Sequence, residues 1–138
     1  MTVPVTGETA AGDTFEGTYA ISGFDVKNGS LVAVGTLSGT LTDAETGVTQ
    51  TVSNVRVTFP VTASGTCDIL HLELGPLDLD LLGLVVHLDK IVLDIDAQSG
   101  SGNLLGNLLC AVAGLLDNGG PLTQIASLLN QILAALTR

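Results

Sequence analysis

The sequence has very little positive charge. Four Lys and Arg residues stand against fourteen Asp and Glu, which gives a formal net charge of −10 at pH 7. Binding to nucleic acid requires clustered Lys and Arg side chains, and docking on anionic lipid surfaces requires them as well. The four basic residues are scattered along the chain, so the composition argues against both kinds of partner.

Aromatic residues, long apolar runs and catalytic motifs are also scarce. Aromatic residues make up 3% of the chain and tryptophan is absent, so the core must be built from Leu, Val, Ile and Ala. No apolar run reaches the length of about 18 residues that a transmembrane helix needs. The chain contains no phosphate-binding loop, dinucleotide fingerprint or Gly-x-Ser-x-Gly element. We therefore expect no enzyme activity, no cofactor and no transmembrane segment.

The start of the chain lacks the features of an export signal. "MTVPVTGETAAGDTFEG" has neither a basic beginning nor an apolar run. We expect a secreted or cell-surface protein whose leader is absent from this sequence. Residues 1–12 are polar and are predicted to form a flexible lead-in.

Residues 13–97 alternate between apolar and polar positions, which is the pattern of β-strands. The phase of this alternation shifts at Gly23, which predicts a bulge. Asn28-Gly29 is a strong signal for a tight hairpin turn. The segment contains about six strands, and Gly75-Pro76 and Asp89-Lys90 interrupt it further along.

The apolar period becomes helical over residues 102–137. Leucines recur at spacings of three and four, and "DNGGP" at 117–121 divides the segment into two helices. Strands followed by helices predict one α+β domain over 1–138. We expect an antiparallel sheet or partial barrel of about six strands, with the two C-terminal helices packed on it or inside it.

The two cysteines are predicted to form a disulfide. Cys67 precedes a strand and Cys110 lies in the middle of the first helix, so the bond would pin that helix to the sheet. A single pair of cysteines in a secreted domain favours this pairing. The alternative is a pair of buried free thiols in a cytosolic protein.

Two sets of residues are candidates for a binding site. Alternation places His71 with Glu73 and His87 with Asp89 on a common strand face, and these four are acceptable ligands for a divalent metal. The competing interpretation is a solvated face of an antiparallel sheet. Apolar helix residues form the second set, as a ligand or partner face or as core: Leu105, Leu109, Val112, Leu129, Ile132, Leu133 and Leu136.

The block "CDILHLELGPLDLDLLGLVVHLDKIVLDIDAQSGSGNLLGNLLCAVAGLLD", residues 67–117, resembles a recurrent signature of secreted prokaryotic proteins of unknown function. The resemblance extends over about residues 14–135 and implies an exported, compact domain with two matched cysteines. A weaker similarity links the "NLLC" helix, the single disulfide and the sheet to lipid-binding proteins of the BPI/PLUNC type. Neither resemblance assigns a catalytic residue.

Three functions follow as hypotheses. The first is a non-catalytic exported structural or interaction module that binds a protein partner or a second copy of itself, for example along an exposed strand edge. The second is a carrier of an apolar ligand such as a lipid. The third is a divalent-metal-binding protein that uses the two His and two acidic residues named above.

Overall fold

The structure is a computed structural model that describes residues 2–81, 83–96, 104–117 and 119–136. Eight strands precede two helices along the chain. The elements are β1 (Thr2–Thr9), β2 (Thr14–Lys27), β3 (Ser30–Thr42), β4 (Thr49–Gly65), β5 (Ile69–Leu74), β6 (Leu77–Leu81), β7 (Leu84–Leu88), β8 (Ile91–Asp96), α1 (Leu104–Asp117) and α2 (Leu122–Leu136).

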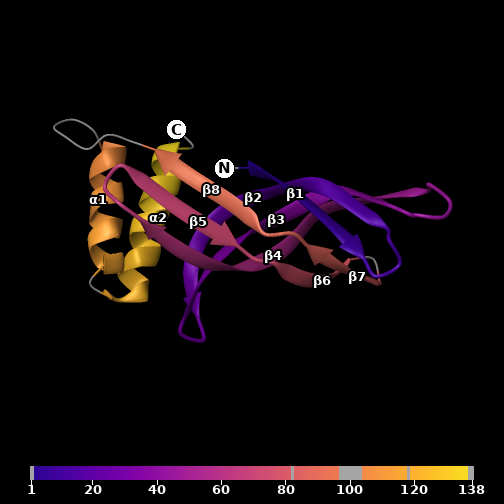
Figure 1. Cartoon of the computed structure of the whole chain (residues 1–138), viewed down its shortest axis with the longest axis horizontal. Coiled ribbons are helices and arrows are strands. Elements are labelled where there is room, and N and C mark those ends of the chain that lie inside the picture. Colours follow the sequence, from indigo (N-terminus) through magenta and orange to yellow (C-terminus); the bar gives the residue numbers. More distant parts are fainter. Residues whose placement is uncertain (1, 82, 97–103, 118, 137–138) are drawn as a thin grey trace.

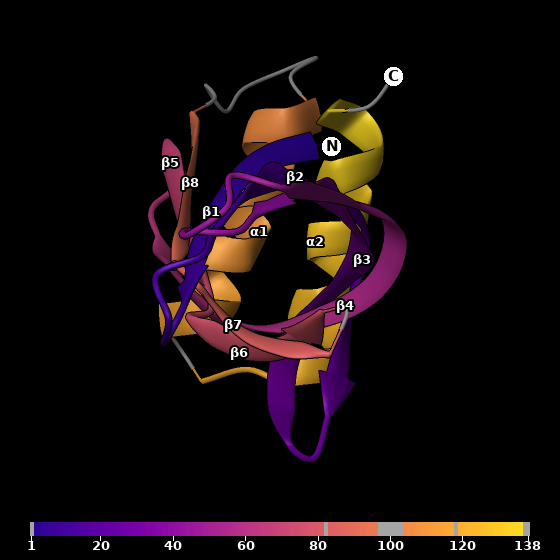
Figure 2. The ribbon, with the colours of Figure 1, turned by 90° about the vertical axis from the view of Figure 1, so that its right-hand side faces the viewer.

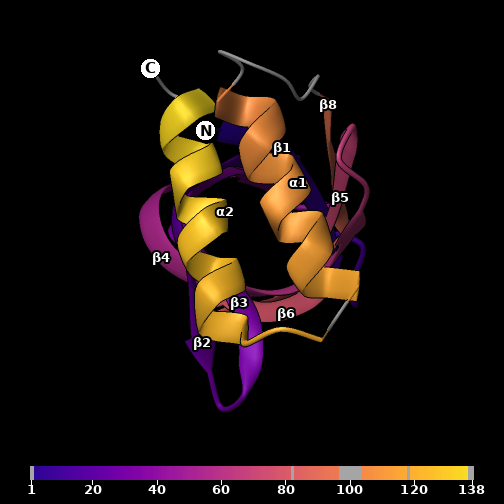
Figure 3. The same cartoon turned by 90° about the vertical axis from the view of Figure 1, so that its left-hand side faces the viewer.

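The strands form one antiparallel sheet in the order β6-β7-β1-β2-β3-β4-β5-β8. The sheet curls around its long axis but does not close: β6 and β8 are its end strands, and among the described residues β1 and β4 are each unpaired along part of one side. Figure 1 shows the elongated body with both helices at one end. Figure 2 looks along this axis from the opposite end, and Figure 3 looks from the helix end. The predicted α+β class, with a partial barrel followed by two helices, is confirmed.

Two predictions about the strands are wrong. Within the predicted lead-in, Thr2–Thr9 is a strand rather than a flexible segment, because β1 pairs with β2 over seven residues and buries Val3 and Val5. The described residues form eight strands rather than about six, and four of the eight lie in the segment 69–96. At Gly75-Pro76 and again at Asp89-Lys90, the side chains that point inward change from even-numbered to odd-numbered residues. These two breaks separate the β5–β8 pair from the β6–β7 hairpin.

The sequence correctly predicts the details of the β2–β3 hairpin. The turn residues Asn28 and Gly29 both have positive φ angles, 53° and 76°, as a two-residue hairpin turn of this kind requires. The pairing register shifts between Ile21 and Gly23, where the bulge was expected. Past this bulge β2 continues beyond the end of β1, because the last β1–β2 pair is Thr2 with Ala20.

Aromatic rings packed over glycines allow the sheet to curl. An added Cβ at Gly35 would lie 2.2 Å from the carbonyl oxygen of Ala20 and 3.0 Å from the ring of Tyr19. At Gly39 it would lie 2.7 Å from the ring of Phe15. Strongly curved sheets need such glycines, and aromatic side chains fill the space that they leave.

Tyr19 anchors the interior of the curled sheet. It is fully buried and meets Phe59 edge to face, with ring centroids 4.7 Å apart. Its hydroxyl donates to the carbonyl oxygen of Val57 at 2.7 Å and also lies 3.2 Å from that of Ala33. Burial raises the pKa of this hydroxyl. The phenol therefore stays protonated and joins the backbones of β3 and β4 to the core.

The two helices cover one end of the barrel. They pack against each other, and α2 also packs along β2. Asn130 joins α2 to β2, which lies far away along the chain. Its Oδ1 accepts from the N–H of Phe24 at 2.6 Å, and its Nδ2 donates to the carbonyl oxygen of Phe24 at 3.0 Å. The side-chain amide thus forms hydrogen bonds with backbone groups of β2 that have no partner on a neighbouring strand.

We predict opposite effects for two Gly→Ala substitutions. Gly35→Ala should lower the free energy of unfolding by about 2–3 kcal/mol, because backbone atoms must move to admit the methyl group. Gly114→Ala on α1 should raise it by about 1 kcal/mol, since nothing lies within 4 Å of its added Cβ and Ala is the better helix former. Urea unfolding at equal protein concentration measures both. A Gly35→Ala variant as stable as the wild type would contradict the packing described here.

Candidate functional site

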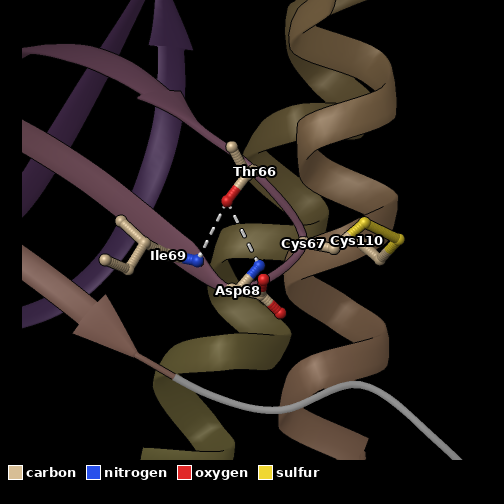
Figure 4. Close-up of a disulfide and its surroundings, with 5 residues drawn as sticks. All are labelled: Thr66, Cys67, Asp68, Ile69 and Cys110. Carbon is tan, nitrogen blue, oxygen red and sulfur yellow. Dashed lines mark hydrogen bonds between the residues drawn. A yellow bond between two sulfur atoms is a disulfide. The ribbon is translucent and has the colours of Figure 1, made fainter.

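The disulfide between Cys67 and Cys110 joins the turn after β4 to the middle of α1 (Figure 4). Thr66 shapes this turn, because its Oγ1 accepts from the N–H groups of Asp68 and Ile69, both at 3.3 Å. The predicted pairing is confirmed. The bond is at the surface, with Cys110 exposed, and it fixes α1 to the β4–β5 hairpin.

His71 and Glu73 lie together on the outer face of β5, as the alternation predicted. The Nδ1 of His71 is 2.6 Å from Oδ1 of Asp94 on β8, and its Nε2 is 3.0 Å from Oε2 of Glu73. Lys90 reaches the other oxygen of Glu73 at 3.1 Å. Both ring nitrogens face carboxylates, so the arrangement favours the imidazolium, which donates twice.

These contacts shift two pKa values in opposite directions. The hydrogen bonds to Glu73 and then to Asp94 raise the pKa of His71 above its ordinary value of 6.5. The hydrogen bonds from His71 and Lys90 lower the pKa of Glu73. The group is an ion-pair network that links β5 to β8 on the solvent side.

His87 and Asp89 do not join His71 and Glu73. His87 is on β7 and bonds Asp78 of β6 at 2.7 Å through Nδ1. Asp89 follows β7 and accepts from the hydroxyl of Thr6 at 3.0 Å. Within the described part of the chain, no group of three His, Cys, Asp or Glu side chains is arranged to hold a metal ion. The metal hypothesis stays a prediction.

The predicted apolar face of the helices lies mostly in the core. Five of its seven residues are buried among the inner side chains of the sheet, namely Leu109, Val112, Leu129, Ile132 and Leu133. Leu105 is half-buried and Leu136 is 37% exposed. A cavity between α2 and the sheet, lined by Ile95, Leu133 and Leu136 among others, has a volume of only ≈ 10 Å³, about the space of one water molecule.

An open groove of ≈ 460 Å³ runs between α2 and the projecting end of β2. Its lining is uncharged apart from Asp25, and includes Ser127, Asn130 and Gln131. The backbone edge of β2 beneath it is already capped: Asn130 bonds Phe24, and the carboxylate of Asp25 accepts from the N–H of Val26 at 2.8 Å. The groove therefore offers few unpaired backbone groups.

The free edge of β8 does offer such groups. The carbonyl of Ile69 accepts from Thr66, so the odd residues of β5 bond toward β4 and the even ones bond toward β8. In the observed register Leu70 and Leu72 face Ile95 and Leu93. The N–H and C=O groups of Val92, Asp94 and Asp96 consequently point away from β5, where no described strand pairs with them.

Pro4 explains why β1 does not cover this edge. The carbonyl of Thr6 accepts from the N–H of Asp89 at 2.9 Å, so the even residues of β1 face β7 and β8. The next such residue is Pro4, which has no N–H to donate. Pairing ends there, and β1 and β8 diverge toward the helix end of the molecule (Figure 3).

Sequence reasoning missed this edge because it assigned the segment before residue 13 to a lead-in. The signal that was available is "TVPVT" at 2–6, which alternates like a strand and carries a proline. A proline within a strand pattern marks an edge or the end of a ladder. The edge at Val48–Val61 that the sequence suggested is also present: β3 pairs with one side of residues 49–60, and β5 pairs with the other side of β4 only from Val61 onward.

We predict that Cys67→Ser with Cys110→Ser lowers the free energy of unfolding by about 4 kcal/mol, because the bond closes a loop of 43 residues in the unfolded chain. Urea unfolding of the variant beside the oxidised wild type measures this difference. Adding a reductant to the wild type should reproduce it, whereas the variant should not respond to the reductant. A response by the variant would show that the loss has another origin.

We predict that His71 stabilises the fold more at low pH than at high pH. Its pKa is higher in the folded state, so its contribution is fully present below pH 6.5 and is lost as the pH rises through the folded value. The difference in urea midpoint between the wild type and His71→Gln should therefore be largest below pH 6.5 and fall as the pH is raised above it. A difference that does not change with pH would contradict the ion-pair network.

Comparison of the chain with known protein families, with curated proteins and with solved structures finds no match. The two resemblances described from the sequence therefore remain predictions. Neither of the two described helices is long and apolar enough to cross a membrane. The described residues thus form a curled sheet over an apolar core, a disulfide that fixes α1 to the β4–β5 turn, and an unpaired edge on β8.

Proposed function

We propose that this chain is a non-catalytic, exported interaction module that binds a protein partner. The observation that carries the proposal is the open edge of β8 on a scaffold held rigid by the Cys67–Cys110 disulfide. An edge strand with unpaired backbone groups is a template for an added strand. A rigid scaffold reduces the entropy lost when the partner binds.

Two further observations support this proposal. Disulfides persist in extracellular and other oxidising compartments, which agrees with an exported protein. The titratable residues that seemed available for chemistry are engaged with one another on an exposed face, as His71 is with Glu73 and Asp94. An interaction module needs neither a catalytic cleft nor a cofactor.

The carrier and metal hypotheses have less support. The apolar side chains that would line a ligand cavity, such as Leu109 and Ile132, pack against one another. The apolar cavity between α2 and the sheet has only ≈ 10 Å³, against the roughly 300 Å³ of a typical ligand pocket. The larger groove between α2 and β2 is open and is lined mainly by polar side chains, which suits an apolar ligand poorly. Of the candidate metal ligands, His71 and Glu73 pair with each other on β5, whereas His87 pairs with Asp78 of β6 and Asp89 accepts from the hydroxyl of Thr6.

We predict that a partner protein can be crosslinked to this chain at one or more of three surface positions. A photo-crosslinking amino acid is placed singly at Val92 on the β8 edge, at Asp80 on the β6 edge and at Gln131 in the α2 groove, with the chain produced in its source organism. At least one position should give a discrete crosslinked protein, and Glu16, an exposed position on β2 that is paired with β1 on one side and with β3 on the other, serves as the comparison site.

Native mass spectrometry of the purified chain separates the other hypotheses. We expect the chain mass less two hydrogens for the disulfide, with no further component. A bound lipid or metal ion released on activation would favour the carrier or the metal hypothesis. The absence of a discrete crosslinked protein at all three sites would contradict the interaction module.

A further inference from the structure

We propose that the β8 edge accepts an extended, Lys- or Arg-bearing segment of a partner protein as an additional strand. The inference rests on the proposed function and names the site and the chemistry of the partner. The site is the unpaired boundary between β8 and β1, here called the seam. Its occupant is a strand in which basic and apolar residues alternate.

The backbone of the edge supplies the first part of this recognition. Val92, Asp94 and Asp96 present N–H and C=O groups at alternate positions, which is the pattern that an incoming strand needs. On the opposite side of the seam, Pro4 withholds the donor that would otherwise let β1 compete for these groups. The carbonyl of Thr6 accepts from the N–H of Asp89 at one end of this seam. Toward the helix end the ribbons of β1 and β8 run apart (Figure 3).

The side chains of β8 define the outer face of the occupant. Val92, Asp94 and Asp96 point outward and are exposed. Residues directly opposite one another on neighbouring strands share a face, and opposite charges in such pairs stabilise the sheet. The partner residue opposite Asp96 is therefore basic, a basic residue opposite Asp94 shares that carboxylate with His71, and an aliphatic side chain fits opposite Val92.

The inner face of the occupant is apolar. The intervening residues of β8, such as Leu93 and Ile95, point toward the core, and Leu93 is only half-buried. Leu136, at the end of α2, is 37% exposed and lines the same small apolar cavity as Ile95. Apolar side chains of an added strand would cover these surfaces and remove them from water.

A second copy of the chain is a poor occupant. Antiparallel pairing of two β8 edges centred on Asp94 sets the two Asp94 carboxylates opposite each other, and β6 has the same difficulty with Asp78 and Asp80. Like charges directly opposite on neighbouring strands are destabilising. The net charge of −10 on each copy adds a repulsion that a basic segment turns into attraction.

The test uses the full oxidised chain and two synthetic heptapeptides of equal composition. The probe is Lys-Val-Lys-Val-Lys-Val-Lys, and the comparison peptide is Lys-Lys-Val-Val-Val-Lys-Lys, each blocked at both ends. Isothermal titration at about 150 mM salt limits long-range charge effects. We expect the alternating peptide to bind at least tenfold more tightly than its rearranged counterpart.

Three variants locate the binding. Val92→Pro removes an N–H that faces the seam and leaves the β5–β8 hydrogen bonds in place, and Asp96→Lys reverses an outward charge. Each should weaken the alternating peptide about tenfold. Asp117→Lys makes the same charge change on α1 and should leave its affinity within twofold of the wild type. Circular dichroism and urea unfolding confirm that each variant is folded.

Several results would overturn the inference. Equal binding of the two peptides, or equal losses in Asp96→Lys and Asp117→Lys, would show attraction by net charge alone. The absence of binding by the alternating peptide, or a wild-type dimer that Val92→Pro dissolves, would also reject it. A partner crosslinked only at Asp80 or Gln131 would reject the β8 site while leaving the interaction module intact.

Discussion

Backbone hydrogen bonding between neighbouring strands decides the shape of this molecule, and two prolines limit where it can continue. The curled sheet brings its first strand close to its last, and closure would require β1 to pair with β8 and β4 to pair with β6. Pro4 faces the seam between β1 and β8, and Pro60 faces the seam between β4 and β6. The carbonyl of Pro60 accepts from the N–H of Gly75, but Pro60 has no N–H to donate in exchange. Each seam therefore begins with a hydrogen bond and then opens, so the protein keeps two edges that a closed barrel would lack.

An unclosed barrel must protect its interior by other means, and here the helix pair does so at one end. Leucine and isoleucine side chains of α1 and α2 join the same core cluster as Phe15, Tyr19 and Phe59. The disulfide and the Asn130–Phe24 hydrogen bonds attach this pair at two separate points, on the β4–β5 turn and on β2. The apolar residues that a carrier would use to bind a ligand thus complete the core instead.

The parts of the fold that follow from local periodicity could be predicted from the sequence. The strand region, the two helices, the bulge at Gly23 and the Asn28-Gly29 turn each leave a signature within a few residues. The disulfide also followed, because the chain has only two cysteines. What the sequence did not reveal was set by partners distant along the chain. The short segment 2–9 became a strand because Val3 and Val5 find a core, and His71 and His87 separated because β5 and β7 join different neighbours.

The acidic edges leave backbone groups free for pairing and also oppose pairing with identical chains, two properties that ordinarily conflict. An exposed strand edge promotes aggregation unless something discourages the approach of identical chains. Aspartates that point outward at alternate positions of β6 and β8 do this by repulsion, at edges where backbone groups stay free. Negative charge of this kind opposes any acidic or identical chain and attracts a basic one, so in the interaction that we propose the same feature would oppose self-pairing and favour a basic partner. At β8 the imidazolium of His71 and the ammonium of Lys90 neutralise Asp94 and Glu73 in part, so Asp96 presents the least compensated charge on this edge.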